Sequence, residues 1–140
     1  MIICEHEGMI ANFVSLQQGY PPNTSWGNYN ALGLLRNGRL VAGVIYNSYE
    51  EGNVCMHVAA SPGVLTRKAI FAAFDYPFNQ LGKRRVTAMI PAKNKKAIAF
   101  NEGLGFKYEG TMRHYFNDDD ALIYGMLRED CRFLNMRKAA

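Results

Sequence analysis

Residues 94–110 read NKKAIAFNEGLGFKYEG, and within this stretch the chain changes from a helix to a strand. Asn94 is a typical N-cap residue, and the polar and apolar residues after it predict a short helix over 95–102 that ends at Gly103. The residues beyond the second glycine predict a strand over 106–113. A helix that leads directly into a strand is the repeating unit of α/β proteins.

The rest of the second half continues this alternation. Ile70, Phe74 and Phe78 recur at four-residue spacing and predict a helix over 66–78, which Pro77 kinks or closes near its end. The other elements predicted here are a helix stop at Leu81-Gly82, a strand over 86–90, a polar turn over 117–120 and a strand over 121–128.

The first half predicts one helix followed by an antiparallel meander. A helix over 6–18 ends at the segment 19–23, which contains two prolines. Asn37-Gly38 is a strong hairpin signal between strands over 29–35 and 39–46. A turn over 50–53 and a strand over 54–60 follow. The order α-β-β-β-α-β-α-β-β predicts a single domain over 1–140, an α/β (α+β) fold with a mixed, mostly antiparallel sheet flanked by helices.

Several strings occur in the order and spacing of one known family. They are the quoted stretch with Arg113 after it, Phe74 to Phe78 with Leu81-Gly82 and Arg85-Val86, Asp120 to Glu129, and Trp26 with the glycines from Gly33 to Gly43. Together they cover roughly residues 26 to 134 and resemble the GNAT superfamily, in particular its RimJ/RimL-like branch. The short chain also resembles small GNAT proteins carried by bacteriophages.

This resemblance implies a fold with splayed central strands and an activity. The expected enzyme is an acyl-CoA-dependent N-acetyltransferase that moves an acetyl group from acetyl-CoA to a primary amine. By position, the splayed strands are 54–60 and 86–90, and the cofactor arm lies between them. Backbone groups at Val58 and Ala60 are then expected to face the arm, and Asn94 matches the family asparagine that contacts it. Asn94 is equally suited to cap the helix after it, and both roles can hold together.

A pyrophosphate needs backbone N–H donors and the positive end of a helix. The loop over 61–65 and the start of the next helix supply both. The residues expected to bind the phosphates are Gly63, Val64, Leu65, Thr66, Arg67 and Lys68. The loop departs from the family pattern Q/R-x-x-G-x-G/A, since only Gly63 remains and is displaced by one position. The hydroxyl of Thr66 can face a phosphate or only cap its helix.

Transfer to an amine requires a group that accepts a proton. His57 lies on the predicted third strand, where the family often places its base, and an unperturbed imidazole titrates near neutral pH. The alternative is a partly buried structural histidine. The family acid that protonates the leaving thiolate is usually a tyrosine at the position of Asn101, which cannot donate a proton in this way. Tyr108, Tyr115 and Tyr124 are substitutes without support from their position.

The acceptor amine is expected over the early loop and the last hairpin, where Trp26, Tyr29 and Tyr115 are candidate binding residues. The three carboxylates of 118–120 either attract a cationic amine or form a solvated turn. The amine-bearing acceptor is a small molecule or a protein.

The net charge is +4 and the sequence pI is near 9.0. Two basic clusters, 83–85 and 93–96, carry much of the positive charge. They form a solvated surface, or they attract a polyanion such as a nucleotide cofactor or nucleic acid. Two other functions therefore stay open: a catalytically degenerate acyl-CoA-binding module, and a nucleic-acid-directed binder or modifier.

The remaining features exclude other classes. The apolar runs are too short to cross a bilayer, and the first residues do not form a secretory signal. The three cysteines have no motif spacing, so we expect reduced thiols, a cytoplasmic protein and no metal site. The exposed edges of a small mixed sheet make a homodimer plausible.

Overall fold

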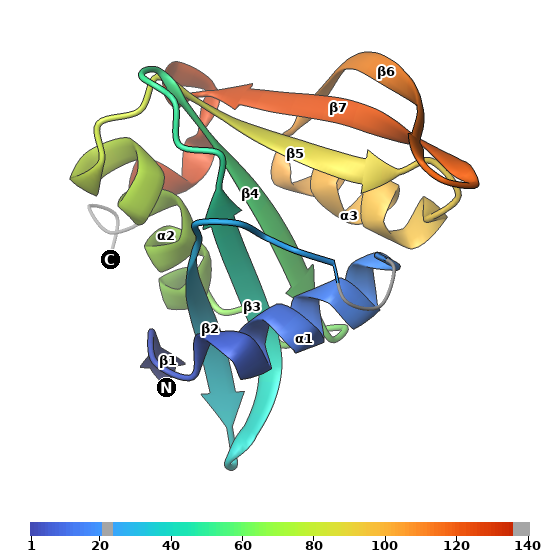
Figure 1. Cartoon of the computed structure of the whole chain (residues 1–140). Helices are drawn as coiled ribbons and strands as arrows, with labels where there is room; N and C mark the ends of the chain where they lie inside the picture. Colours follow the sequence, from blue (N-terminus) through green and yellow to red (C-terminus); the bar gives the residue numbers. More distant parts are fainter. Residues whose placement is uncertain (21–23, 136–140) are drawn as a thin grey trace.

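One seven-stranded sheet in the order β1-β2-β3-β4-β5-β7-β6 organises the computed structural model, which describes residues 1–20 and 24–135 (Figure 1). The strands are β1 (Ile2–Ile3), β2 (Asn30–Arg36), β3 (Arg39–Asn47), β4 (Asn53–Ala60), β5 (Arg85–Pro91), β6 (Lys107–Phe116) and β7 (Asp119–Leu127). The helices are α1 (Glu7–Gln18), α2 (Arg67–Asp75), α3 (Lys95–Leu104), the π-helix η1 (Tyr76–Gln80) and the 3-10 helices η2 (Arg128–Asp130) and η3 (Arg132–Asn135).

The predicted fold class is confirmed. All neighbouring strands pair antiparallel except β4 and β5, which pair in parallel. The hairpin at Asn37-Gly38 is confirmed as well, since both residues have positive φ angles of 53° and 76°. Strand β1 was not predicted, because two residues carry no periodic pattern.

Helices cover both faces of the sheet (Figure 1). Helix α1 packs on one face through Ile10 and Val14, which are fully buried beside Trp26. Helices α2 and α3 pack on the opposite face, where two phenylalanines and three residues of β4 are buried: Phe74, Phe78, Val54, Met56 and Val58. Because strand side chains alternate, successive residues of β4 face different layers of the molecule.

Two predicted helix ends differ from the structure. Helix α3 continues through Gly103 to Leu104, and Gly105 ends it with φ 110° and an N–H that donates to the carbonyls of Asn101 and Glu102. Of the two glycines, Gly105 has the left-handed backbone that ends a helix, and Gly103 does not.

The helix predicted over 66–78 is divided. Helix α2 ends at Asp75, and the chain widens into the π-helix η1, where Leu81 N–H donates to the carbonyl of Tyr76. Pro77 has no N–H to continue the α-helical pattern, which accounts for the change. Helix α1 ends at Gly19, with φ 77°, and the predicted proline stop at 21–23 lies outside the described residues.

Gly33 and Gly43 allow α1 to lie close against the sheet. They face each other in the pairing of β2 and β3. A Cβ atom on Gly43 would lie 2.9 Å from Ile10 Cγ2 and 3.2 Å from Val14 Cγ2. Any larger residue would therefore push the helix away from the strands.

We expect Gly43→Ala to lower the free energy of unfolding by about 1–3 kcal/mol, because it overpacks the interface between α1 and the sheet. Gly8→Ala is the matched control, since Gly8 lies in α1 and a Cβ there meets no atom within 4 Å. That variant should stabilise the protein by about 0.5–1 kcal/mol through helix propensity. Urea unfolding measures both, and equal effects of the two substitutions would contradict the packing argument.

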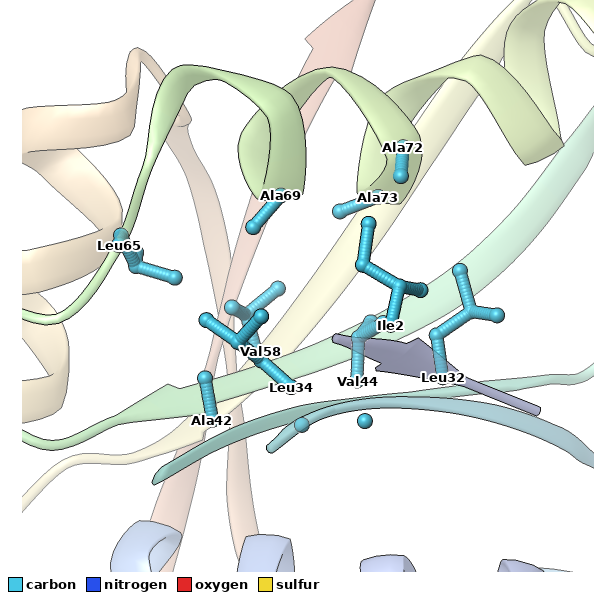
Figure 2. Close-up of a pocket in the computed structure, with 12 residues that line it drawn as sticks. Ile2, Leu32, Leu34, Ala42, Val44, Val58, Leu65, Ala69, Ala72 and Ala73 are labelled. Atoms are coloured by element: carbon cyan, nitrogen blue, oxygen red, sulfur yellow. The ribbon is translucent and has the colours of Figure 1, made fainter. Parts of the chain in front are cut away.

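A small apolar void lies between α2 and the sheet. Figure 2 shows Ala69, Ala72 and Ala73 facing Val44 and Val58 across it. Its volume is about 40 Å³, and its lining is almost entirely apolar. Because a bound water needs polar partners, this void is a packing space beneath α2 and not a polar ligand site.

Strands β4 and β5 separate after a short paired region, as predicted. Only Asn53, Val54 and Cys55 of β4 pair with β5, opposite 85–87. Beyond these residues the two strands diverge, and the C-terminal end of α1 lies at the opening (Figure 1). The divergence leaves backbone groups of β4 without a strand partner on that side.

Candidate active site

A cavity of about 520 Å³ lies beside the end of β4, beyond the residues of β4 that pair with β5, and we call it the β4–β5 cavity. Its described lining comes from the end of α1, the end of β4, the loop over 61–65 and the beginning of α3. Five of the predicted cofactor-binding residues line it: Val58, Ala60, Gly63, Leu65 and Asn94. The other four predicted residues do not line it. They lie in the same loop or at the start of α2: Val64, Thr66, Arg67 and Lys68. The structure thus brings the loop over 61–65, β4 and the start of α3 around one space.

The loop is held at both ends. Ser61 N–H donates to the carbonyl of Val41 at 2.9 Å, and Arg36 Nη2 donates to the carbonyl of Val64 at 3.1 Å. Gly63 has φ 73°, a backbone conformation that residues other than glycine rarely adopt. The retained glycine therefore sits where the loop turns.

The N-terminus of α2 follows the loop. Thr66 Oγ1 accepts the N–H of Ala69 at 3.1 Å, so the predicted capping role is confirmed. Of the hydrogen bonds within the described chain, none uses the backbone N–H of Arg67 or Lys68. Both side chains are exposed, so two free N–H donors and two cations lie together at the positive end of a helix dipole.

Asn94 joins two helices at the edge of the β4–β5 cavity. Its Oδ1 accepts the N–H of Ala97 at 3.1 Å, which confirms the predicted cap of α3. Its Nδ2 donates to the carbonyl of Gln18 at 2.7 Å. One side chain therefore fixes the end of α1 against the beginning of α3.

Gln18 was not among the predicted site residues, although it is the last residue of α1 and lines the same cavity. The side chain is 4% exposed. Its Nε2 donates to the carbonyl of Val58 on β4. A single glutamine at a helix end has no sequence signal that separates it from a surface residue.

His57 is buried on the α1 side of the sheet, with 5% exposure. Its Nε2 lies 3.0 Å from Asn47 Oδ1, and the amide of Asn47 donates to the carbonyl of Trp26. The amide oxygen of Asn47 is therefore the acceptor, which places the imidazole proton on Nε2. Burial lowers the pKa of His57 from 6.5 to about 4, so the ring is neutral at pH 7 and its Nδ1 keeps a lone pair.

Tyr20 provides the link between His57 and β5. Its hydroxyl donates to the carbonyl of Met89 at 2.7 Å and lies 3.3 Å from His57 Nδ1. Both His57 and Met89 lie two residues beyond the last paired residues of β4 and β5. Tyr20 therefore spans the two strands where they begin to separate, and burial raises the pKa of its hydroxyl well above the usual range, which keeps it protonated.

Sequence reasoning missed Tyr20. A tyrosine that directly follows a helix-ending glycine belongs to no motif, and its partners lie 37 and 69 residues away in the chain. The only signal was its place between the end of a helix and two prolines, which marks a turn and gives no direction to the side chain.

A second cavity, of about 570 Å³, lies on the α1 side and is lined by Tyr20 and by the predicted acceptor residues Trp26 and Tyr29. The Trp26 ring stacks on Tyr20 at 5.0 Å between centroids, and its centroid is 4.7 Å from that of His57. Tyr115 lies outside this lining, and its exposed ring contacts Phe116, which packs against Tyr20.

Two of the three carboxylates of 118–120 accept hydrogen bonds from backbone N–H groups of neighbouring segments. Asp119 accepts the backbone N–H of Lys93 at 2.9 Å, and Asp120 accepts that of His114 at 2.8 Å. These bonds support a turn-forming role for this acidic segment.

The candidate acid positions are engaged elsewhere. Asn101 is 1% exposed, and its Nδ2 donates to the carbonyl of Ala97 within α3. Tyr124 donates to Glu102 at 2.9 Å, and Tyr108 shares a hydrogen bond of 2.7 Å with Thr111. Neither tyrosine lines the β4–β5 cavity.

The basic cluster at 83–85 is also partly engaged. Arg85 forms an ion pair with Glu109 at 2.8 Å. Lys83 Nζ donates to the carbonyls of Glu50 and Glu51. Two of the three cations therefore fasten neighbouring segments of the chain.

Comparison with known proteins identifies the fold. No protein-family model matches the chain, and no curated protein matches it by sequence. Solved structures do match. The spermidine N-acetyltransferase of Vibrio cholerae, in complex with CoA and spermine, superposes with a TM-score of 0.70 at 17% identity, covering 96% of this chain and 98% of that one. The chain has the GNAT fold.

Two further structures agree. The same Vibrio cholerae enzyme in a dodecameric, intermediate state gives a TM-score of 0.72 at 15% identity, over 97% of this chain and 96% of that one. The ribosomal-protein-S5-alanine acetyltransferase of Vibrio fischeri gives 0.61 at 15% identity, over 74% and 64%. Within the described residues, none of the helices combines the length and hydropathy that crossing a membrane requires.

Proposed function

We propose that the protein is an acetyl-CoA-dependent N-acetyltransferase that acts on a primary amine. The observation that carries the proposal is the β4–β5 cavity, which lies beside β4 beyond the three residues that pair with β5. A GNAT-fold enzyme solved with CoA and spermine supports the same class of reaction, as does the acetyltransferase activity named for the other structural neighbours.

The residues around the cavity fit the cofactor in three chemical respects. The free N–H groups of Arg67 and Lys68 suit phosphate oxygens at a helix N-terminus. The unpaired edge of β4 at Val58 and Ala60 suits an extended arm that bears amides. A buried acceptor atom of Gln18, considered below, has no partner within the described chain.

We assign phosphate binding to the loop over 61–65 and to the start of α2. Gly63, Val64, Leu65 and Thr66 form the turn into the helix, and the side chains of Arg67 and Lys68 neutralise charge. When bound, acetyl-CoA supplies the acyl group as a thioester. The chain's own contribution is to bind and orient the reactants and to move protons.

We assign His57 as the proton acceptor, acting through Tyr20. A buried imidazole with a free Nδ1 lone pair cannot touch an amine directly, but the Tyr20 hydroxyl oxygen lies 3.3 Å from that nitrogen. The hydroxyl can take a proton from an amine as it passes its own proton to Nδ1. A weak base suffices, because an amine N–H becomes acidic as the new bond to carbon forms.

We assign the acceptor amine to the second cavity, against Trp26 and Tyr29. Tyr115 lies outside the lining, and we assign it a contact with the outer part of the acceptor. Among the described residues that line this cavity, none is an aspartate or a glutamate. The assignment to the RimJ/RimL-like branch, the cytoplasmic location and a homodimer stay predictions.

The cofactor can be tested without knowledge of the acceptor. CoA present at about 100 times its dissociation constant should stabilise the folded protein by about 2.7 kcal/mol and raise the melting temperature accordingly. Arg67→Ala and Lys68→Ala together should weaken CoA binding at low salt, and an exposed matched pair at Lys107 and Arg113 should not. A melting temperature that does not respond to millimolar CoA would contradict the proposal.

One observation favours a second function, a module that binds acyl-CoA without turnover. Asn101 occupies the position of the family acid, and its amide is bonded within α3. Thiol release across a panel of primary amines separates the two functions. Tight binding of CoA without release above the rate in buffer on any amine would favour the module.

A further inference from the structure

The Oε1 atom of Gln18 is a buried acceptor that has no hydrogen-bond partner within the described chain. The other end of the same amide has a partner, since Nε2 donates to the carbonyl of Val58. An unpaired buried acceptor is costly, and a bound ligand or an ordered water can supply the missing donor.

The surroundings of Gln18 limit where that donor comes from. The backbone carbonyl of Gln18 accepts from Asn94 Nδ2 at 2.7 Å, which holds the residue against α3. The side chain reaches β4 on the other side. Gln18, Val58 and Asn94 all line the β4–β5 cavity, which places the Gln18 amide beside this cavity.

The bond to Gln18 also changes what β4 offers to a ligand. Alternate residues of a strand direct their backbone groups to the same edge, and Val58 lies on the edge that β5 has left. Its carbonyl would be the natural acceptor for an amide lying along this edge. Because Gln18 Nε2 already donates to this carbonyl, the acceptor beside this edge that still lacks a partner within the described chain is Gln18 Oε1.

We propose that Gln18 Oε1 accepts an amide N–H of the pantetheine arm, in place of the Val58 carbonyl. The inference rests on the proposed function, because it takes the arm of coenzyme A as the occupant of the β4–β5 cavity. Gln18, at the end of α1, then provides the acceptor that the strand would otherwise provide. The same bond connects α1 to the bound cofactor.

The test compares CoA with adenosine 3′,5′-bisphosphate, which carries the nucleotide part of CoA but no arm. Calorimetry gives the dissociation constants for the wild type and for Gln18→Met, which keeps the length of the side chain, and with it the cover over the Val58 carbonyl, but has no polar atoms. The variant should weaken CoA binding by about 5- to 30-fold and leave adenosine 3′,5′-bisphosphate unchanged. Gln80→Met is the matched control, because Gln80 is exposed on η1 and does not line the cavity.

A second measurement uses only the wild type, so it does not depend on how Gln18→Met folds. CoA analogues with an N-methyl group on one pantetheine amide lose the donor at that amide. One of them should bind the wild type about 5- to 30-fold more weakly than CoA does. Gln18→Met should bind this analogue and CoA with similar affinity.

Three outcomes would overturn the inference. They are unchanged CoA binding by Gln18→Met, equal weakening of both ligands, and wild-type binding of all methylated analogues as tightly as CoA. A wild type that binds neither CoA nor adenosine 3′,5′-bisphosphate would instead contradict the proposed function itself, and the inference would fall with it.

Discussion

Replacing Tyr20 by phenylalanine is expected to lower turnover by about 10²- to 10⁴-fold while the dissociation constant of CoA stays nearly the same. The substitution removes only the hydroxyl that lies between His57 Nδ1 and the carbonyl of Met89. The aromatic ring and its stacking on Trp26 remain. The rate of thiol release is measured with the amine that gives the highest rate in the panel.

The proposed proton path also predicts how substitutions of Tyr20 and His57 combine. His57→Asn should cause a similar loss, and the double variant should lose little more than either single one, because the two residues act as one unit. Tyr108→Phe is the matched control, since Tyr108 is 56% exposed and bonds only to Thr111. Turnover of Tyr20→Phe close to the wild-type rate would remove Tyr20 from the mechanism.

Acidification should destabilise the protein through His57. The pKa of this imidazole is about 4 in the folded protein and 6.5 in an unperturbed chain. Between these values the unfolded state binds a proton that the native state does not, so stability rises with pH and is lost as the pH falls from 6.5 toward 4. We expect His57 to contribute about 3 kcal/mol to the loss of unfolding free energy between pH 7 and pH 4.

Urea unfolding at the two pH values isolates this contribution, because other groups also titrate. The wild type should lose about 3 kcal/mol more than His57→Asn does. His114→Asn is the matched control, since His114 is exposed and asparagine tolerates its φ of 53°. If His57→Asn and the wild type lose the same free energy, the imidazole is not the buried neutral group described above.

Local patterns predicted most of the fold because its elements are defined by near neighbours in the chain. The hairpin at Asn37-Gly38 and the cap at Asn94 follow from residues within a few positions of each other. The helix ends were less certain for a physical reason. Gly103 and Gly105 both suit a helix end, and the left-handed backbone at Gly105 depends on how α3 meets the core.

The candidate site also has residues that the local sequence predicts and residues that it does not. The loop around Gly63 and the helix start at Thr66 could be predicted, because a strand, a loop and a helix in succession build a phosphate site from adjacent residues. Gln18 and Tyr20 could not. Their functional contacts join the end of α1 to β4 and β5, and the sequence separations of 40 and 69 residues leave no local pattern.

The sequence by itself therefore determined the order of the three main helices and of the six longer strands, the GNAT resemblance and the place of the loop over 61–65, because periodicity, turns and caps are local. Only the tertiary structure decided that His57 is buried and neutral, and that Tyr20 connects it to β5. It also decided that the Val58 carbonyl is already occupied by Gln18. A pKa and the use of a hydrogen-bond acceptor depend on burial and on distant neighbours, and packing alone sets both.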